Sequence, residues 1–177
     1  MRLPALPLVA LAFTLGLGRS PAFAADETAA RPPAIELPAI NEEVPLPRIK
    51  EICAFYGLHE LWQKIERDPP PRPFKSDGCT GWVNEWQGIS IYPAGFLHDL
   101  KYWAGYPGED VARLIADAEL MIDVARLLHS TAMAETMFHG VRLGGSEHLN
   151  AAFSWGFGRR KPDDPDAGPA PAGKSGP

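Results

Sequence analysis

The chain has 177 residues, a formal net charge of −5, 45% hydrophobic residues and 19 prolines. The negative charge argues against nucleic acid as a partner, because a nucleic-acid-binding surface has to neutralise phosphates with basic residues. It also removes simple electrostatic attraction to anionic membranes, so lipid binding would have to rest on apolar and aromatic contacts.

The first 24 residues have the features of a secretory signal peptide. A short positive start, Met1-Arg2, is followed by an apolar run over 3–18 and by Ala22-Phe23-Ala24, a small-x-small cleavage signature. A membrane anchor is the alternative, but the run is short for a bilayer and is interrupted by prolines. We therefore expect residues 1–24 to be removed. The mature chain would then be exported, to a bacterial periplasm or outside the cell, with no transmembrane segment.

Both ends of the remaining chain are poor in core-forming residues. Residues 25–47 hold scattered prolines and acids without a period, which predicts a Pro-rich linker. Residues 159–177 are dominated by Pro, Gly, Ala and Asp, which predicts a disordered tail. The folded domain is expected over 48–158, which is long enough for one modest hydrophobic core.

Within this domain the hydrophobic pattern is helical. A first helical segment starts at Ile49, is expected to break at Gly57 and ends before Pro69. A loop rich in Gly, Ser and Asp follows at 74–82. Further helices are predicted at about 92–104, 108–128 and 131–141, and an aromatic closing segment at 147–158. The expected fold class is all-α, a small domain with two packed long helices and irregular loops.

The helix at 92–104 carries the residues of greatest chemical interest. His98 and Tyr102 are i and i+4 neighbours on one face, and Asp99 lies about 100° round from His98. Asp117 lies at the edge of the apolar stripe of the next helix, where antiparallel packing would bring it to His98. A carboxylate that holds one histidine nitrogen fixes the tautomer and leaves the other nitrogen as a base. The alternative is a packed histidine and a carboxylate at the solvent boundary.

Asp99 has a different neighbour from His98. A carboxylate next to the Gly78–Trp82 loop suits calcium, which takes carboxylate and carbonyl oxygens; alternatively, Asp99 simply complements the helix dipole. Trp82 and Trp86 lie in this loop region and are the best candidates for contact with a bilayer or an acyl chain. Arg113 and Arg142 are expected on solvated faces.

Export makes a disulfide possible, and Cys53 and Cys79 are the two cysteines of the chain. We expect a bridge between them in preference to two free thiols. It would join the first helical segment to the loop and contribute about 3 kcal/mol of stability.

Together these motifs resemble the secreted phospholipase A2 family, including small exported bacterial proteins with that domain. The order and spacing of the motifs carry the resemblance more than any single motif does. They span about residues 74–158 and comprise Ser76-Asp77-Gly78-Cys79, His98 to Trp103, Ala116-Asp117-Ala118-Glu119-Leu120, Gly140 to Gly145 and Trp155-Gly156-Phe157-Gly158.

The resemblance implies calcium-dependent hydrolysis of phospholipid ester bonds, with a phospholipid or membrane surface as substrate. His98 would be the base that activates water, Asp117 the acid that orients it, and Tyr102 a hydrogen-bond donor to that acid. Calcium would be bound by Asp99 and by backbone carbonyls of the loop, and would stabilise the oxyanion. The carbonyls concerned belong to Gly78, Thr80 and Trp82.

Two departures from the family pattern support a second hypothesis. The family has a Cys-Cys pair directly before its His-Asp helix, whereas this chain has Ala94-Gly95, which leaves Cys53 as the partner for Cys79. The family loop also has glycine where this chain has Thr80 and Trp82. The second hypothesis is therefore a catalytically inactive, exported helical module with a binding or structural role.

Overall fold

The computed structural model describes residues 35–149 and 151–159. The predicted signal peptide and residues 160–177 of the predicted tail lie outside this range. The described part is mostly helical, which confirms the helical class. Its helices are α1 (Leu46–Phe55), α2 (His59–Arg67), α3 (Tyr92–Ala104), α4 (Asp110–Leu128) and α5 (Thr131–Gly144), followed by 3₁₀ turns η1 (Glu147–Leu149) and η2 (Phe157–Arg159).

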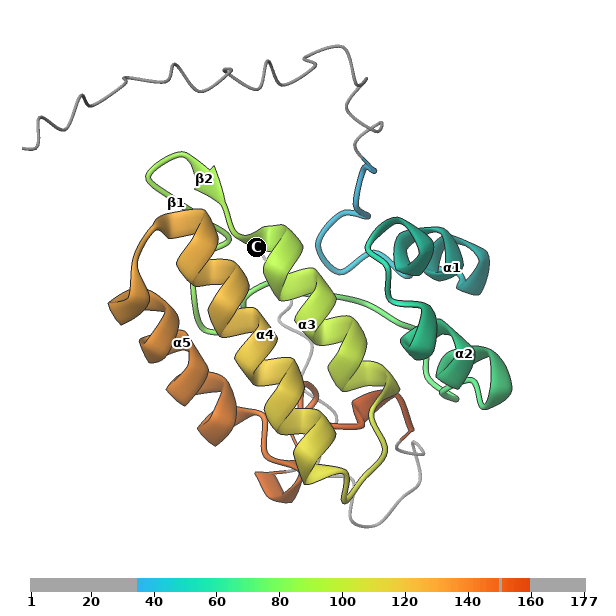
Figure 1. Ribbon diagram of the computed structural model, residues 1–177. Helices are drawn as coiled ribbons and strands as arrows, with labels where there is room; N and C mark the ends of the chain where they lie inside the picture. Colours follow the sequence, from blue (N-terminus) through green and yellow to red (C-terminus); the bar gives the residue numbers. More distant parts are fainter. Residues whose placement is uncertain (1–34, 150, 160–177) are drawn as a thin grey trace, which may run out of the picture. The chain divides into compact units, whose positions relative to one another are not determined.

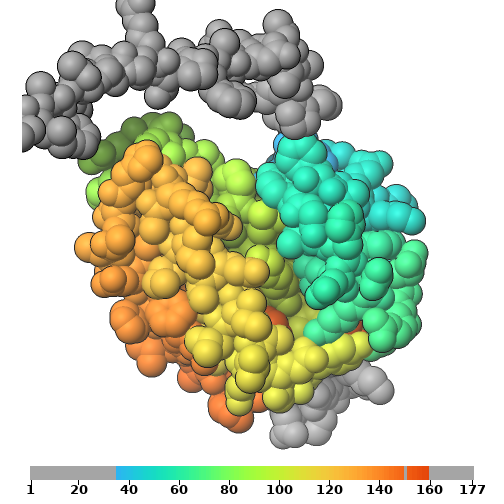
Figure 2. Space-filling model, in the orientation of Figure 1, coloured from blue at the N-terminus to red at the C-terminus, as the bar shows by residue number. Residues whose placement is uncertain are grey.

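Helices α3, α4 and α5 lie side by side, and consecutive helices run in opposite directions because short loops join them (Figure 1). Helices α1 and α2 lie on the other side of α3. In the space-filling view only a strip of α3 is visible, between α4 on one side and α1 and α2 on the other (Figure 2). Helix α3 is thus the central element of the domain, and most of its side chains are buried.

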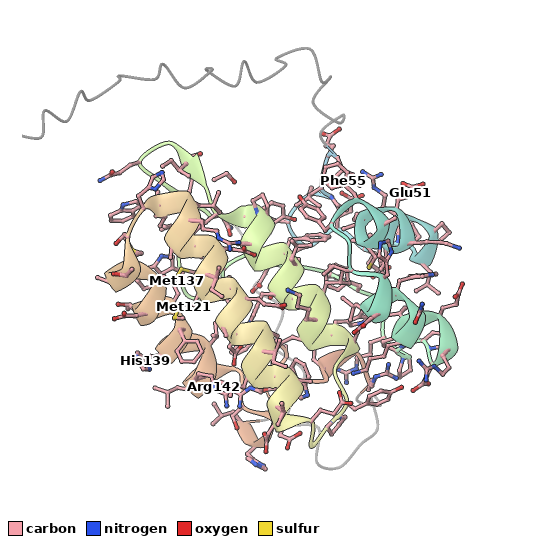
Figure 3. The ribbon with its side chains drawn as sticks, viewed as in Figure 1. Glu51, Phe55, Met121, Met137, His139 and Arg142 are labelled. Atoms are coloured by element: carbon pink, nitrogen blue, oxygen red, sulfur yellow. The ribbon has the colours of Figure 1, made fainter. Side chains whose placement is uncertain are left out.

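Different faces of α3 belong to different clusters of buried residues. Phe96, Leu100 and Trp103 pack with residues of α1 and α2, including Ile52 and Ile65. A second cluster joins the start of α3 to α4 and α5, with Ile91, Ala94, Leu120, Val124 and Met137 as members. Met121 on α4 and Met137 on α5 point toward the interface between these helices (Figure 3). Because α3 is packed on two sides, most of its side chains are apolar and few of them face solvent.

Part of the segment expected to be a linker is packed against the domain. Val44 is buried and pairs with Phe74 in an isolated antiparallel bridge. The backbone N–H of Asn41 donates to the carbonyl of Ser76 at 2.8 Å, and Ile35 and Leu37 pack against the first buried cluster. The described residues from 35 onward therefore belong to the folded body, and α1 begins at Leu46.

Two local features separate the helices, and the first of them is the break at Gly57 that the sequence predicts. Gly57 divides α1 from α2 with a φ of +70°, a conformation that glycine adopts at little cost. Before α3, strands β1 (Glu85–Trp86) and β2 (Ile89–Ser90) form a small antiparallel hairpin. In the part of the chain that the structure describes, no helix is long and apolar enough to span a bilayer.

Candidate active site

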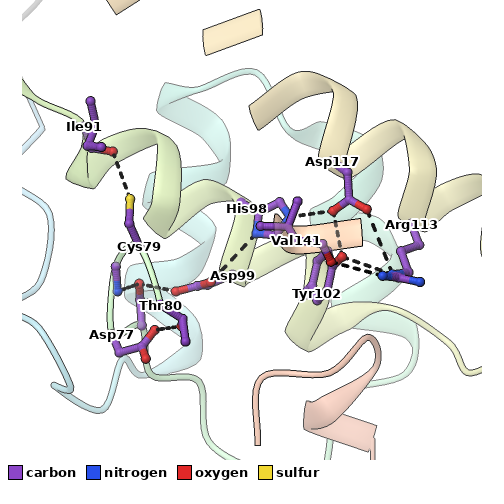
Figure 4. Close-up of polar contacts among 12 residues, drawn as sticks. Asp77, Cys79, Thr80, Ile91, His98, Asp99, Tyr102, Arg113, Asp117 and Val141 are labelled. Carbon is purple, nitrogen blue, oxygen red and sulfur yellow. Dashed lines mark hydrogen bonds and ion pairs between the residues drawn. The ribbon is translucent and has the colours of Figure 1, made fainter. Parts of the chain in front are cut away.

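The predicted His98–Asp117 pair is formed between α3 and α4. Nε2 of His98 lies 2.7 Å from Oδ1 of Asp117, and the two side chains are 8% and 0% exposed (Figure 4). The antiparallel packing of α3 and α4 brings them together. This hydrogen bond assigns the ring proton to Nε2, which leaves Nδ1 as the basic nitrogen.

Asp117 accepts more hydrogen bonds than the one from His98. The hydroxyl of Tyr102 donates to Oδ1 at 2.6 Å, and the guanidinium of Arg142 donates to Oδ2 at 2.7 Å. Burial alone would raise the pKa of Asp117, but the hydrogen bonds from His98, Tyr102 and Arg142 hold it below the ordinary value. Asp117 is therefore an ionised carboxylate in a fixed orientation.

Arg113 was expected on a solvated face and is instead buried, with 6% exposure. Its Nε donates to the hydroxyl of Tyr102 at 3.1 Å, and its Nη2 donates to the carbonyls of Val141 and Arg142. It thus joins α4 to the end of α5. The sequence signal that could have revealed it is the i, i+4 spacing of Arg113 and Asp117 on one helix.

Arg142 was likewise expected in solvent, and its side chain is 27% exposed in its ion pair with Asp117. No spacing on α5 indicates this contact, because it joins residues 25 positions apart. The conformation of His98 is therefore supported by residues of three helices, α3, α4 and α5.

The pKa of His98 reflects two opposing effects. Burial lowers it, but the hydrogen bond to Asp117 and the negative charges of Asp117 and Asp99 outweigh burial and leave the pKa above its ordinary value. The surroundings thus stabilise the imidazolium more than water does. A base in such surroundings holds a proton that it has accepted from water.

Asp99 lies on the loop side of His98, as the sequence predicts. Its Oδ1 is 3.9 Å from Nδ1 of His98, beyond hydrogen-bond distance. Its Oδ2 accepts a hydrogen bond of 2.6 Å from the hydroxyl of Ser76, and that hydroxyl accepts the backbone N–H of Gly78. Ser76 was not among the predicted site residues, and it connects the loop to the carboxylate.

The loop touches α3 at a glycine. A Cβ on Gly95 would lie 2.8 Å from Sγ of Cys79 and 2.9 Å from the carbonyl oxygen of Gly78. Any side chain there would push the loop away from the helix. Because Gly95 and Asp99 are one turn apart on α3, the loop backbone and the carboxylate share one face. The absence of a side chain at Gly95 allows this contact where the phospholipase A2 pattern has cysteine.

Asp99 and the backbone carbonyls of the loop line one pocket and are oxygen donors of the kind that calcium takes. Among the described residues no Lys or Arg forms an ion pair with Asp99, and burial raises its pKa above the ordinary value. The Cys79 carbonyl accepts the N–H of Trp82, whereas those of Gly78, Thr80 and Trp82 accept no hydrogen bond from any described residue. The pocket therefore offers one carboxylate without a cationic partner and three carbonyls without a hydrogen bond, all counted among the described residues.

The described residues contain no comparable set of ligands for a transition metal. No group of three or more His, Cys, Asp or Glu side chains within 35–149 and 151–159 could hold a metal ion. His139, for example, points away from the domain on α5 (Figure 3).

His98, Asp99 and the loop open on one pocket of about 460 Å³. Trp82 lies at this pocket with 37% exposure, whereas Trp86 lies outside it on β1 and is 40% exposed. The far wall is largely apolar and comes from α4, α5 and the segment after them. Its members include Leu120, Met137, Gly140, Val141, Gly144 and Phe153.

The expected disulfide is not formed in the structure. Cys53 and Cys79 are buried free thiols. They belong to the two different clusters of buried residues, with α3 between them. Burial raises the pKa of Cys53 to about 11 and, together with the charge of Asp99, that of Cys79 to about 12. Both thiols therefore stay protonated at neutral pH.

Comparison of the chain with protein-family models, with curated proteins and with solved structures finds no match in any of the three.

Proposed function

We propose that this chain is a calcium-dependent esterase of the phospholipase A2 type, which hydrolyses phospholipid ester bonds with a water activated by His98. The observation that carries the proposal is that the two ring nitrogens of His98 have different surroundings. Nε2 is held by Asp117 at 2.7 Å, and Nδ1 lies on the side of Asp99 and the pocket. This is the arrangement that a general base requires.

The roles of the protein groups follow from their contacts. Nδ1 of His98 takes a proton from the attacking water, so that no serine or cysteine nucleophile is needed. Asp117 stabilises the imidazolium that forms, and Tyr102 and Arg142 keep Asp117 in place. A calcium ion held by Asp99 and the carbonyls of Gly78, Thr80 and Trp82 would supply the positive charge that stabilises the oxyanion.

The pocket supports an ester with an aliphatic chain. Its volume of about 460 Å³ lies within the range of small-molecule sites, and its wall of Leu120, Met137, Val141 and Phe153 is apolar. Exposed Trp82 at the pocket and exposed Trp86 on the neighbouring hairpin are suited to contact with a lipid surface. With a signal peptide at 1–24, the enzyme would act in the periplasm or outside the cell.

A second candidate function is a catalytically inactive, exported module on the same scaffold. The observation that favours it is the loop, where Thr80 and Trp82 replace the glycines of the phospholipase A2 pattern. Such a module would keep its role after Asp99→Asn and show no calcium-dependent rise in melting temperature.

The test is the release of fatty acid from phosphatidylcholine vesicles by purified protein with added calcium, compared with EGTA. We expect calcium-dependent release by the wild type and a loss of about 100-fold or more in His98→Ala. His59→Ala is the matched control, because His59 is an exposed histidine at the start of α2. Equal release by the wild type and His98→Ala would rule out catalysis by His98.

A further inference from the structure

We infer that Ser76 is a positioning residue. Its hydroxyl fixes the Asp99 carboxylate relative to the Gly78 backbone, so that both can bind the same calcium ion. This inference rests on the proposed calcium site. It adds to that site a residue that touches neither substrate nor metal.

The side chain of Ser76 bridges the two parts of the site. Its hydroxyl donates to Oδ2 of Asp99 at 2.6 Å and accepts the N–H of Gly78 at 3.0 Å. The same hydroxyl therefore donates to the carboxylate on helix α3 and accepts from the backbone of the loop. Because Asp99 is ionised when it binds a cation, the first of these bonds is charge-assisted and short.

Ser76 is itself fixed in position. The residue is 1% exposed, and its carbonyl accepts the N–H of Asn41 at 2.8 Å. Two residues earlier, Phe74 forms the antiparallel bridge with Val44. The segment before α1 thus anchors the backbone that carries the hydroxyl, so the hydroxyl cannot follow Asp99 if that side chain rotates.

The bond also decides which oxygen of Asp99 is left for a cation. Oδ2 accepts the hydrogen bond from Ser76, whereas Oδ1 lies 3.9 Å from Nδ1 of His98, so among the described residues Oδ1 is the less engaged oxygen. Loss of the hydroxyl would free the carboxylate to rotate and remove a tie between it and the loop. Partners that orient a metal-binding carboxylate typically contribute 10- to 100-fold to metal affinity.

The chain contains a matched control. Ser154 is also buried, with 0% exposure, and its hydroxyl accepts the N–H of Ala151 at 2.9 Å. Ser154 thus shares with Ser76 the burial and the local bond to backbone, but within 35–149 and 151–159 its hydroxyl bonds to no carboxylate. A general cost of removing a buried serine would appear in both variants, whereas an effect on calcium would appear in one.

The experiment is calorimetric titration of calcium into the wild type, Ser76→Ala, Ser76→Cys and Ser154→Ala, each first shown to be folded by circular dichroism and melting in EDTA. We expect a single site in the wild type, a Kd about 10- to 100-fold weaker in Ser76→Ala, and a Kd within about twofold of the wild type in Ser154→Ala. Ser76→Cys keeps the size of the side chain with a weaker donor, and should also bind calcium more weakly.

Each other outcome overturns a defined part of the argument. Wild-type affinity in both Ser76 variants would overturn the role of Ser76 and leave the calcium site standing. An equal loss in Ser76→Ala and Ser154→Ala would also overturn it, because the effect would then be general. Absence of calcium binding by the wild type would overturn both the inference and the calcium-dependent function.

Discussion

Replacement of Asp117 by Asn tests whether the buried carboxylate organises the site. Asn has almost the same shape as Asp but only one acceptor oxygen, and it carries no charge. That oxygen can still accept from His98 and Tyr102, but the amide NH₂ would then face Arg142, where Oδ2 now accepts a 2.7 Å hydrogen bond. The variant therefore leaves a cation facing a donor.

The cost follows from the burial of the partners. Removing one member of a buried ion pair typically costs 3–5 kcal/mol, because the remaining charge loses its partner. Arg142 is 27% exposed and can recover some hydration, so we expect the lower end, about 3 kcal/mol. For a domain of this size that corresponds to a fall of roughly 10 °C in Tm.

The assay is urea unfolding at pH 7, followed by circular dichroism. Asp123→Asn is the control on the same helix, because Asp123 is 41% exposed and lies 3.8 Å from Arg126; we expect it to change stability by less than about 0.5 kcal/mol. In an Arg142→Gln background, Asp117→Asn should cost about 1.5–3 kcal/mol less than in the wild type. An equal effect of Asp117→Asn and Asp123→Asn would refute the reasoning.

The lowered pKa of Asp117 adds a pH signature to this comparison. A carboxyl whose pKa is lower in the folded state stabilises the fold above its ordinary pKa of 3.8, and that stability is lost as the pH falls further. The advantage of the wild type over Asp117→Asn should therefore be present at pH 5 and shrink below about pH 4.

Three further predictions concern the thiols, the pocket and the tryptophan at its edge. Cys53 and Cys79 should react slowly with a thiol reagent at pH 8 in the native protein, since burial raises their pKa values to about 11 and 12; both should react after denaturation without reductant. Gly140→Ala should stabilise α5 by about 1 kcal/mol, because a Cβ there meets nothing within 4 Å. Gly140→Leu should instead fill part of the pocket, which Gly140 lines, and should slow the hydrolysis of long-chain esters more than that of short-chain esters. Trp82→Ala should bind lipid vesicles about fivefold more weakly, whereas Phe55→Ala, at an exposed position on α1, should bind as the wild type does.

Each of these has a clear contrary result. Denatured protein without reactive thiols would mean that the two cysteines are bridged after all. Unchanged chain-length preference in Gly140→Leu would separate the pocket from the substrate. Equal loss of vesicle binding in the Trp82 and Phe55 variants would remove the special role of the loop tryptophan.

The helices could be predicted because their patterns are local. Pro93 near the start and Gly105 at the end fix the extent of α3, and the structure has it at Tyr92–Ala104. The pairing of His98 with Asp117 was accessible for the same reason, because short loops make consecutive helices antiparallel neighbours and the apolar stripe of α4 has to face α3.

The contacts that the sequence did not reveal depend on side chains that reach across the fold. Arg113 carries a charge and was placed in solvent, but it is buried because its nitrogens find the Tyr102 hydroxyl and two carbonyls of α5. Ser76 appears in a turn-forming loop, where a serine usually caps its own backbone, and nothing local shows that its proton goes to Asp99.

The disulfide shows the limit of counting cysteines. With only Cys53 and Cys79 available, pairing is the natural expectation for an exported chain. The structure instead packs each thiol into its own buried cluster on either side of α3. The loop is instead held against α3 by close packing at Gly95, where Sγ of Cys79 and the Gly78 carbonyl take the space that a side chain would fill.

The most direct test of the central claim is the rate of fatty-acid release as a function of free calcium, in the wild type and in Asp99→Asn. The account predicts a saturable rise with calcium in the wild type and little or no rise in Asp99→Asn, because the variant removes the α3 carboxylate that the Ser76 hydroxyl connects to the loop. Asp77→Asn is the matched control, since Asp77 lies in the same loop and bonds only the Thr80 hydroxyl among the described residues. Calcium-independent release by the wild type, or the same calcium response in Asp99→Asn, would contradict the account.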